Sequence, residues 1–393
     1  MEIRKAFKFE LMPNGEQKRL MKRFCGCARF VFNKALAWQN AQYKADNTFK
    51  FGYTKIANLL PSWKEEHVFL SQCHSQVLQQ SLKDLEVSFR NFFKKRADFP
   101  KFKKRGLKDS IRFPQGFKLE EANRRVYLPK IGWMRYRQSQ LVMGALKNMT
   151  VSLKCGKWFV SIQTEQQIVE QPHPAGGEVG IDLGVVRFAT LSNGEYVEPL
   201  NAFKREAARL KKAQQRLSRK TKYSQNWQKA KARVSGLHHH MANARKDYLH
   251  QLTATLSKNH ALVYVEDLQV SNMSKSAKGD VVHPGKKVRQ KSGLNKSILD
   301  QGWSEFRRQL DYKLAWRGGY LVAVPPHHTS QTCPDCGHVS RDNRKTQANF
   351  ACVACGYEEN ADLVGAINIL RAGRAQLACE VNDAVRSSAA GTH

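Results

Sequence analysis

Four cysteines place the strongest local constraint on how this 393-residue chain folds. They follow the pattern C-x₂-C-x₁₅-C-x₂-C, a spacing typical of a zinc ribbon, and are Cys333, Cys336, Cys352 and Cys355. A glycine follows each pair and allows backbone N–H groups to turn toward the thiolates. Four sulfur ligands leave no position for a catalytic water, so we expect one structural Zn²⁺ ion; a redox-active pair is the alternative.

The other five cysteines lack metal-ligand spacing. We interpret them as small buried hydrophobic residues or free thiols. They are Cys25, Cys27, Cys73, Cys155 and Cys379.

The charge balance indicates a polyanionic partner. The chain has 66 Lys and Arg residues against 33 Asp and Glu residues, a formal net charge of +33, while 41% of its residues are hydrophobic. That composition is too apolar for a disordered tail. A folded chain of this charge repels itself unless a polyanion neutralises it, and nucleic acid is the commonest such partner. A ribosomal protein and a protein of anionic membranes are the alternatives.

No signal peptide or membrane span is expected. The N-terminus alternates charged and apolar residues, and no segment approaches the ~18 to 20 uninterrupted apolar residues of a membrane-spanning helix. We therefore expect a cytoplasmic protein without membrane contact, associated with the nucleoid when it is bound to DNA.

The first half of the chain has the pattern of a β-rich domain with inserted helices. Residues 3–11 alternate like a strand, and apolar residues then recur at three- to four-residue spacing up to about residue 95. Short β-like runs follow. This order predicts a small barrel over residues 1–172 with a helical insertion at about 15–100, and the turn-rich segment 172–177 predicts a domain boundary.

The second half predicts a mixed α/β domain. Apolar strands alternate with helices from residue 173 to residue 332, which places the cysteine pattern, residues 333–356, before a last helix at 361–372. The polar, Lys-rich segment 274–296 predicts a mobile basic loop. Residues 373–393 are expected to form a flexible C-terminal tail.

One or two long helices over residues 203–250 are unusually basic. Residues 204–246 contain fourteen Lys or Arg residues and a single acid, Glu206. A merely solvated helix face, the alternative, usually carries interspersed acids. We therefore interpret this stretch as a surface for nucleic-acid phosphates. The candidate contacts are Lys211, Lys212, Arg216, Arg219 and Lys220.

Three acids occupy special positions in the α/β half. Asp182 lies inside the apolar strand 179–183, Glu266 ends the apolar strand 261–265, and Asp362 begins the last helix. A buried carboxylate is costly unless a cation compensates it, and clustered carboxylates suit Mg²⁺. Taken singly, each acid could equally be a helix cap or a salt-bridge partner, and the sequence alone does not bring the three together.

Several segments resemble the TnpB family, the OrfB-type proteins of insertion sequences that are related to the type V CRISPR nucleases. The resemblance includes Gly180-Ile181-Asp182-Leu183-Gly184-Val185, Val265-Glu266-Asp267-Leu268, the four-cysteine ribbon and Asn360-Ala361-Asp362 with Asn368-Ile369. These look like the three RuvC motifs of that family. Family members usually have Asn-Ala where this chain has Val364-Gly365, a departure that leaves the acid intact.

The resemblance implies a multidomain α+β fold. Its parts would be an RNase-H-like (RuvC) α/β nuclease core at 173–332, an inserted zinc ribbon at 333–356, a last RuvC motif at 357–372 and a preceding β-barrel wedge domain with a helical recognition insertion. It implies that Asp182, Glu266 and Asp362 are catalytic acids that hold Mg²⁺, two ions in all.

The resemblance also implies partners. These are a guide RNA from the transposon end and a double-stranded DNA target beside a short adjacent motif, bound by a monomer of the protein. The implied activity is RNA-guided DNA cleavage by two-metal-ion hydrolysis. A catalytically silent RNA-guided repressor and a strand-transfer transposase are the alternatives. By position Gln79 is the candidate for reading a base of the adjacent motif, with a solvated glutamine as the alternative.

Overall fold

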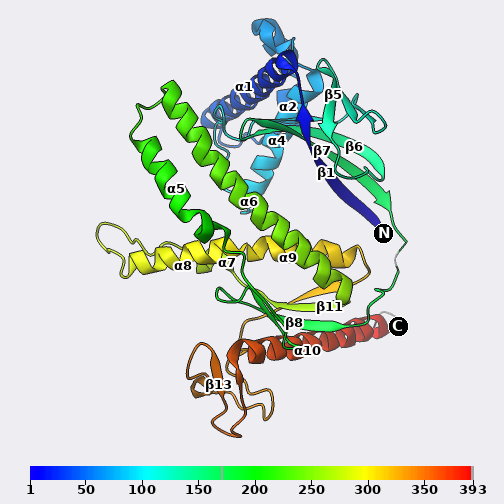
Figure 1. The fold of residues 1–393 in the computed structure, drawn as a ribbon. Coiled ribbons are helices and arrows are strands. Elements are labelled where there is room, and N and C mark those ends of the chain that lie inside the picture. The colour runs from blue at the N-terminus through cyan, green and yellow to red at the C-terminus, as the bar shows by residue number, and fades with distance from the viewer. Residues whose placement is uncertain (170, 391–393) are drawn as a thin grey trace. The chain divides into compact units, whose positions relative to one another are not determined.

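The computed structural model describes residues 1–169 and 171–390, with side chains described through residue 379 (Figure 1). The chain divides into two compact units, Met1–Val169 and Glu170–His393, close to the boundary at residue 172 that the sequence suggests. Each unit has its own sheet and its own core.

A seven-stranded antiparallel sheet organises the first unit. Strand β1 (Glu2–Met12) buries Ile3, Phe7, Phe9 and Leu11 and pairs along its length with β7 (Lys157–Gln167). The order of strands is β2-β6-β7-β1-β5-β4-β3. The other strands are β2 (Ser110–Phe113), β3 (Lys118–Glu120), β4 (Arg125–Leu128), β5 (Gly132–Arg137) and β6 (Ala145–Lys154).

The sheet is open where the sequence predicted a barrel. Its order ends at β2 and β3, and no pairing joins these two strands in the described part of the chain. The edge strands have only four and three residues, which leaves few backbone groups that could close a barrel.

Helices fill the chain between β1 and β2. Helix α1 (Gly15–Ala45) begins with a capping box in which Asn14 Oδ1 accepts a hydrogen bond from the Gln17 N–H at 2.8 Å. Its buried face packs with that of α4 (Ser75–Phe93) in the core beneath the sheet. Two short helices lie between them, α2 (Tyr53–Ala57) and α3 (Leu60–Glu66).

A five-stranded mixed sheet organises the second unit, in the order β10-β9-β8-β11-β12. Strands β8 and β12 both run parallel to β11, whereas β9 and β10 are antiparallel to their neighbours. The strands are β8 (Glu178–Leu183), β9 (Ala189–Leu191), β10 (Tyr196–Val197), β11 (Leu262–Glu266) and β12 (Tyr320–Val324).

Helices cover this sheet on both faces. Buried residues of α6 (Gln225–Asn259), α8 (Val288–Gln301) and α9 (Trp303–Ala315) form one core with β8, β9 and β11. The long helix α10 (Ala361–Ala390) lies along β8 and buries Ile369 beside Tyr264 and Val322 (Figure 1). Helix α5 (Ala202–Ser218) pairs with α6 as a hairpin, and the short α7 (Val270–Met273) precedes α8.

The end expected for the last helix, residue 372, was wrong, because α10 continues to Ala390, and Ala372 and Leu377 still find apolar partners around Tyr264. Flexibility of the tail at 373–393 stays a prediction, and residues 391–393 lie outside the described residues. The segment 274–296 is not a loop throughout, since α8 begins at Val288 and directs Ile298 into the core.

The cysteine pattern folds as a small separate element between β12 and α10. It contains the hairpin of β13 (Asn349–Ala351) and β14 (Glu358–Asn360). Among the described residues, no helix combines the length and apolar character needed to cross a bilayer.

Candidate active site and cysteine cluster

Asp182 lies near the C-terminal end of β8, at the point where this strand touches helix α10. Val179 and Ile181 are fully buried in the core. Gly180 is a glycine for a steric reason, because a Cβ atom there would collide with the backbone of Ala366 and Leu370 on the helix. Asp182, two residues further along and on the same face of the strand, is thereby brought against the first turns of α10.

Glu266 ends the neighbouring strand β11. Because β8 and β11 are parallel, with Val265 opposite Ile181, Asp182 and Glu266 follow at the same edge of the sheet. The Thr329 hydroxyl donates a hydrogen bond to Glu266 Oε1 at 2.7 Å.

Asp362 lies at the same edge of the sheet and is carried by the first turn of α10. Its N–H donates to Asn360 Oδ1 at 3.1 Å, and a helix N-terminus favours a negative side chain. Arg344 Nη2 lies 3.7 Å from Asp362 Oδ1. The structure therefore brings all three predicted acids to one edge of the sheet.

The three acids affect one another electrostatically. Burial, followed by the negative charges of Glu266 and Asp362, raises the pKa of Asp182 from its ordinary 3.8 to about 7, while Arg344 acts in the opposite direction. A half-buried carboxyl group beside two other acids is stable as an anion only if a cation compensates it. This donor set, all carboxylate oxygens, fits Mg²⁺. The carboxylate oxygens are more widely spaced than the sulfurs of the cysteine cluster.

Arg344 is a residue of this site that the sequence did not reveal. It follows a short 3₁₀ turn (Arg341–Asn343) inside the cysteine element, and its Nη2 also donates to the Gln347 carbonyl at 3.0 Å. Nothing in its local pattern distinguishes it from its basic neighbours Arg341 and Lys345. Only the folding of this element against α10 places it beside Asp362.

The four predicted cysteines converge. Their sulfur atoms all lie within 4.8 Å of one another, and among the described residues this is the one group of three or more possible ligands so close together. Cys333 and Cys352 are buried, whereas Cys336 and Cys355 are exposed. A four-thiolate set of this size fits a structural Zn²⁺ ion.

Glycines shape both cysteine knuckles. Gly337 and Gly356 have φ of 75° and 77°, and their N–H groups donate to the carbonyls of Cys333 and Cys352 at 3.1 Å and 3.0 Å. Burial raises the pKa of Cys352, but N–H groups of Cys355 and Ala354 and the neighbouring thiols lower it to a net value of about 6. A thiol with such a pKa is a ready metal ligand.

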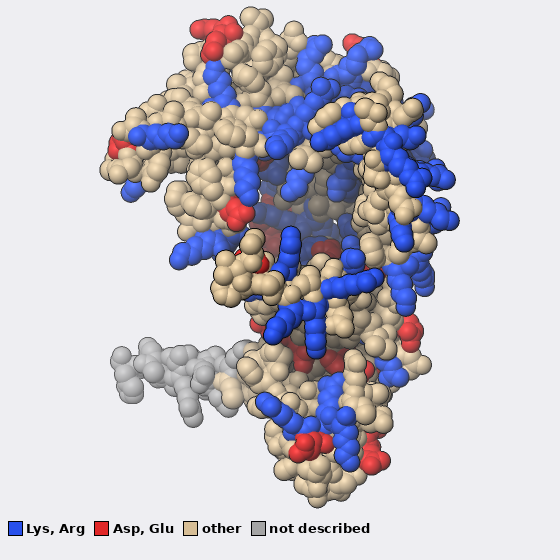
Figure 2. Space-filling model, turned by 90° about the vertical axis from the view of Figure 1, so that its left-hand side faces the viewer, with Lys and Arg blue, Asp and Glu red and all other residues tan. Residues whose placement is uncertain are grey.

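The candidate phosphate contacts lie on α5 and just beyond it. All five are exposed, and none of them forms an ion pair among the described residues. The one acid of the stretch, Glu206, is already paired with Arg209 at 3.1 Å. Figure 2 shows how widely Lys and Arg side chains cover the face that is turned to the viewer, and how few Asp and Glu side chains lie among them.

Comparison with known proteins decides the family. The chain is 55% identical over 381 residues to "Putative RNA-guided DNA endonuclease InsQ" of Escherichia coli (strain K12), covering 96% of this chain and 94% of that protein. The chain belongs to the TnpB family. A second TnpB relative, "Putative RNA-guided DNA endonuclease" of Streptomyces pristinaespiralis, is 33% identical, with 96% of this chain and 91% of the relative covered.

Models of protein families match three parts of this TnpB chain. Residues 160–277 match OrfB_IS605, described as "Probable transposase", and residues 303–369 match "Cas12f1-like, TNB domain". Residues 1–48 match "Helix-turn-helix domain", although in this structure they form β1 and one continuous helix, α1. A solved structure of CasPhi-2 (Cas12j) with crRNA and phosphorothioate DNA has a TM-score of 0.44 at 12% identity, covering 94% of this chain and 91% of that one, too low to carry an argument.

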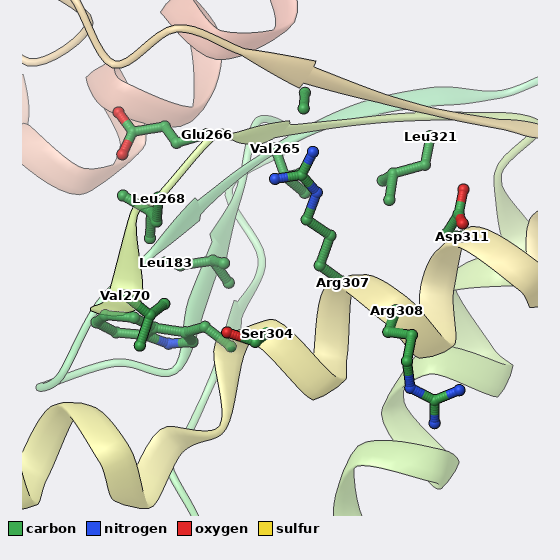
Figure 3. Close-up of a pocket in the computed structure, with 12 residues that line it drawn as sticks. Leu183, Val265, Glu266, Leu268, Val270, Ser304, Arg307, Arg308, Asp311 and Leu321 are labelled. Carbon is green, nitrogen blue, oxygen red and sulfur yellow. The ribbon is translucent and has the colours of Figure 1, made fainter. Parts of the chain in front are cut away.

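A pocket of about 360 Å³ lies beside Glu266 in this TnpB chain (Figure 3). Leu183, Leu268 and Leu321 form apolar walls, and Arg307 of α9 forms an ion pair with Asp267. In Figure 3 the Glu266 carboxylate extends away from Arg307. Of the three acids, Glu266 is the one that lines this pocket.

The candidate base-reading residue lies in the other unit. Gln79 is exposed on α4, while its neighbour Gln76 donates to Gln115 Oε1 at 3.1 Å. The side chain is thus accessible, and its role stays a prediction.

Proposed function

We propose that this chain is a transposon-encoded, RNA-guided DNA endonuclease that cuts target DNA beside a short adjacent motif. The observation that carries the proposal is the meeting of Asp182, Glu266 and Asp362 at one sheet edge, where the pKa of Asp182 responds to both other acids. The names of the two relatives, which cover nearly the whole chain, support the same activity.

The second unit is proposed to be an RNase-H-like, RuvC-type nuclease core. The sheet order β10-β9-β8-β11-β12, with acids at the ends of two adjacent parallel strands and on the last helix, supports this assignment. The first unit would be the wedge and recognition part.

Asp182, Glu266 and Asp362 would hold Mg²⁺, two ions in the full site. When bound, Mg²⁺ lowers the pKa of water and stabilises negative charge on the attacking and leaving oxygens of a phosphodiester. The protein's own contribution is to fix the three carboxylates on rigid elements, two strand ends and a helix start. No His or Lys is needed as a general base in this scheme.

The cysteine cluster would hold one structural Zn²⁺. Cys333, Cys336, Cys352 and Cys355 supply four ligands, so the ion would have no open position and would serve folding only. Its effect on activity would come from Arg344 and from the start of α10, which this element keeps in place.

The guide RNA, from the transposon end, would select the target by base pairing, and the protein would bind its backbone. The exposed cations Lys211, Lys212, Arg216, Arg219 and Lys220 are proposed to contact phosphates. Gln79 is proposed to contact the adjacent motif. One protein chain would act in each complex.

A plasmid-cleavage assay tests the proposal. Plasmid carrying a matched target is incubated with protein purified with or without co-expressed transposon-end RNA, in Mg²⁺. We expect linear product only with the matched guide and target. Cutting without RNA, or no cutting beside any adjacent motif in a randomised library, would contradict the proposal.

The same assay separates the alternatives. A silent repressor would bind the target and leave it intact, although the retention of all three acids speaks against that role. A strand-transfer transposase would join the cut ends to a second DNA, which appears as a recombinant product on sequencing.

A further inference from the structure

A turn of residues 328–332, in the segment that connects β12 to the first cysteine, touches the acid site. Within it the Gln331 and Thr332 N–H groups donate to the His328 carbonyl at 3.0 and 3.1 Å, so the backbone curls back on itself. The turn ends at Thr332, directly before Cys333. The turn therefore lies next to both the acids at the sheet edge and the cysteine element.

Thr329 is the residue of this turn that faces the acids. Its side chain is buried, with 7% of its surface exposed, and its hydroxyl donates to Glu266 Oε1 at 2.7 Å. A hydroxyl hydrogen bond occupies one lone pair of one carboxylate oxygen and leaves the second oxygen for another partner. It also restricts the rotation of a flexible glutamate side chain.

Asn368 binds the backbone of this turn. It lies on α10, is 7% exposed, and its Nδ2 donates to the carbonyls of both Thr329 and Thr332 at 2.8 Å. Both amide hydrogens are thus used on this one turn. Asn343 of the cysteine element also binds the turn, since its Nδ2 donates to the Gln331 carbonyl at 2.9 Å.

The spacing along α10 links this network to the other two acids. Asp362, Gly365 and Asn368 recur every three residues, so they share one side of the helix. Asp362 is itself an acid of the site, Gly365 leaves room for the Asp182 carboxylate, and Asn368 reaches Glu266 through Thr329. One side of one helix thus contacts or supports all three carboxylates.

We propose that Thr329 and Asn368 are positioning residues for the nuclease reaction: Asn368 fixes the turn, and the Thr329 hydroxyl fixes the Glu266 carboxylate for metal binding. This inference rests on the proposed function. Hydrogen-bond partners of carboxylate ligands typically change metal affinity or activity about 10- to 100-fold when they are removed.

The test compares two threonines of the same turn. Thr329→Val removes the hydroxyl at nearly constant volume, and Thr329→Ser restores it. Thr332→Val is the matched control, because the Thr332 hydroxyl donates to the His328 carbonyl at 2.9 Å and to no acid. Asn368→Leu removes both amide donors. Thr329→Ala replaces the valine variant if that protein does not fold.

Two measurements are made on each zinc-loaded, full-length protein. Mn²⁺ binding is followed by electron paramagnetic resonance without RNA, and guided cutting is followed across Mg²⁺ concentrations. We expect Thr329→Val and Asn368→Leu to raise the half-saturating metal concentration about 10- to 100-fold. Thr329→Ser and Thr332→Val should stay near wild type, and guide-RNA affinity should be unchanged in all four.

Equal Mn²⁺ affinity and equal cutting by Thr329→Val and Thr332→Val would overturn the inference. So would a loss in Thr329→Val that Thr329→Ser shares in full. Failure of the proposed function is distinguishable, because wild-type protein would then fail to cut a matched target, or Asp182→Ala would bind Mn²⁺ as wild type does.

Discussion

Gly365 faces the carboxylate of Asp182 so closely that a Cβ atom on this glycine would lie 3.1 Å from Asp182 Oδ2. The contact joins the last helix to the first strand of the unit, residues that are far apart in the sequence. Gly180 on β8 and Gly365 on α10 both allow the strand and the helix to lie close together. The distance between these two elements therefore sets the position of Asp182.

Substitutions at Gly365 should therefore change the rate of DNA cutting more than they change the stability of the fold. Gly365→Ala needs only a small shift of the Asp182 side chain, and alanine stabilises a helix interior by about 1 kcal/mol relative to glycine. Gly365→Val should displace the carboxylate, and a misplacement near 1 Å can reduce a rate by about 100-fold.

Cutting rate and melting temperature are the measurements for this pair. The control is Gly293→Val in α8, where an added Cβ meets nothing within 4 Å. Equal cutting by Gly365→Val and Gly293→Val would contradict the steric argument.

The raised pKa of Asp182 predicts a pH dependence of stability. The folded state holds the proton up to about pH 7, whereas the unfolded chain releases it near pH 3.8. The folded state thus binds more protons between these values, so in Mg²⁺-free buffer the free energy of unfolding should fall as pH rises from about 4 to about 7.

Asp182→Asn removes this contribution. The difference in melting temperature between Asp182→Asn and wild type should grow over that pH range and level off above it, and Mg²⁺ should reduce it. A difference that is constant with pH would show that Asp182 has its ordinary pKa in the folded protein.

The site residues that could be predicted from the sequence are those whose position or spacing already indicates their chemistry. Asp182 and Glu266 stood out because each interrupts or ends an apolar run, and the cysteines because their spacing is itself a ligand geometry. Family membership, inferred from these motifs, is confirmed by the comparison with relatives.

Features that depend on long-range packing were not predictable. Arg344 and Thr329 look like ordinary polar residues until the ribbon folds beside α10. The short strand β3 has too few residues for a periodic signal, and the open sheet edges follow from pairing between distant strands. Val364, a departure from the usual family residue, packs with Cys333 and Phe350 in the small ribbon core.

Zinc removal should damage the nuclease site indirectly. Cys352→Ser, or treatment with a strong chelator followed by Mg²⁺, should lower the melting temperature and reduce cutting, because the ribbon holds Arg344 beside Asp362. Hydrogen exchange at the start of α10 should rise at the same time. Metal analysis should find one zinc per chain in the wild type; protein without zinc, or unchanged exchange after its removal, would refute this account.

The basic helix predicts a salt-dependent RNA affinity. Neutralising Lys211, Lys212, Arg216, Arg219 and Lys220 should weaken guide-RNA binding and flatten the slope of log K against log salt by roughly 0.7 to 0.9 per lost contact. Cutting should recover with excess RNA, since the acids are unchanged. Gln214→Ala with Gln215→Ala, exposed neutral positions on the same helix, is the control. An unchanged slope in the neutralised protein would mean that α5 is only a solvated face.

The most direct measurement of the central claim compares DNA cutting with DNA binding in two variants that each lack one acid. Asp182→Ala and Glu266→Ala proteins, each loaded with a matched guide RNA, are assayed for cleavage of a target plasmid and for target binding by gel shift. Because the acids serve the chemistry and the basic surface supplies the affinity, both variants should bind the target like wild type and leave it uncut. Cleavage by either variant at more than roughly one hundredth of the wild-type rate would contradict the assignment of Asp182 and Glu266 as metal-holding catalytic acids.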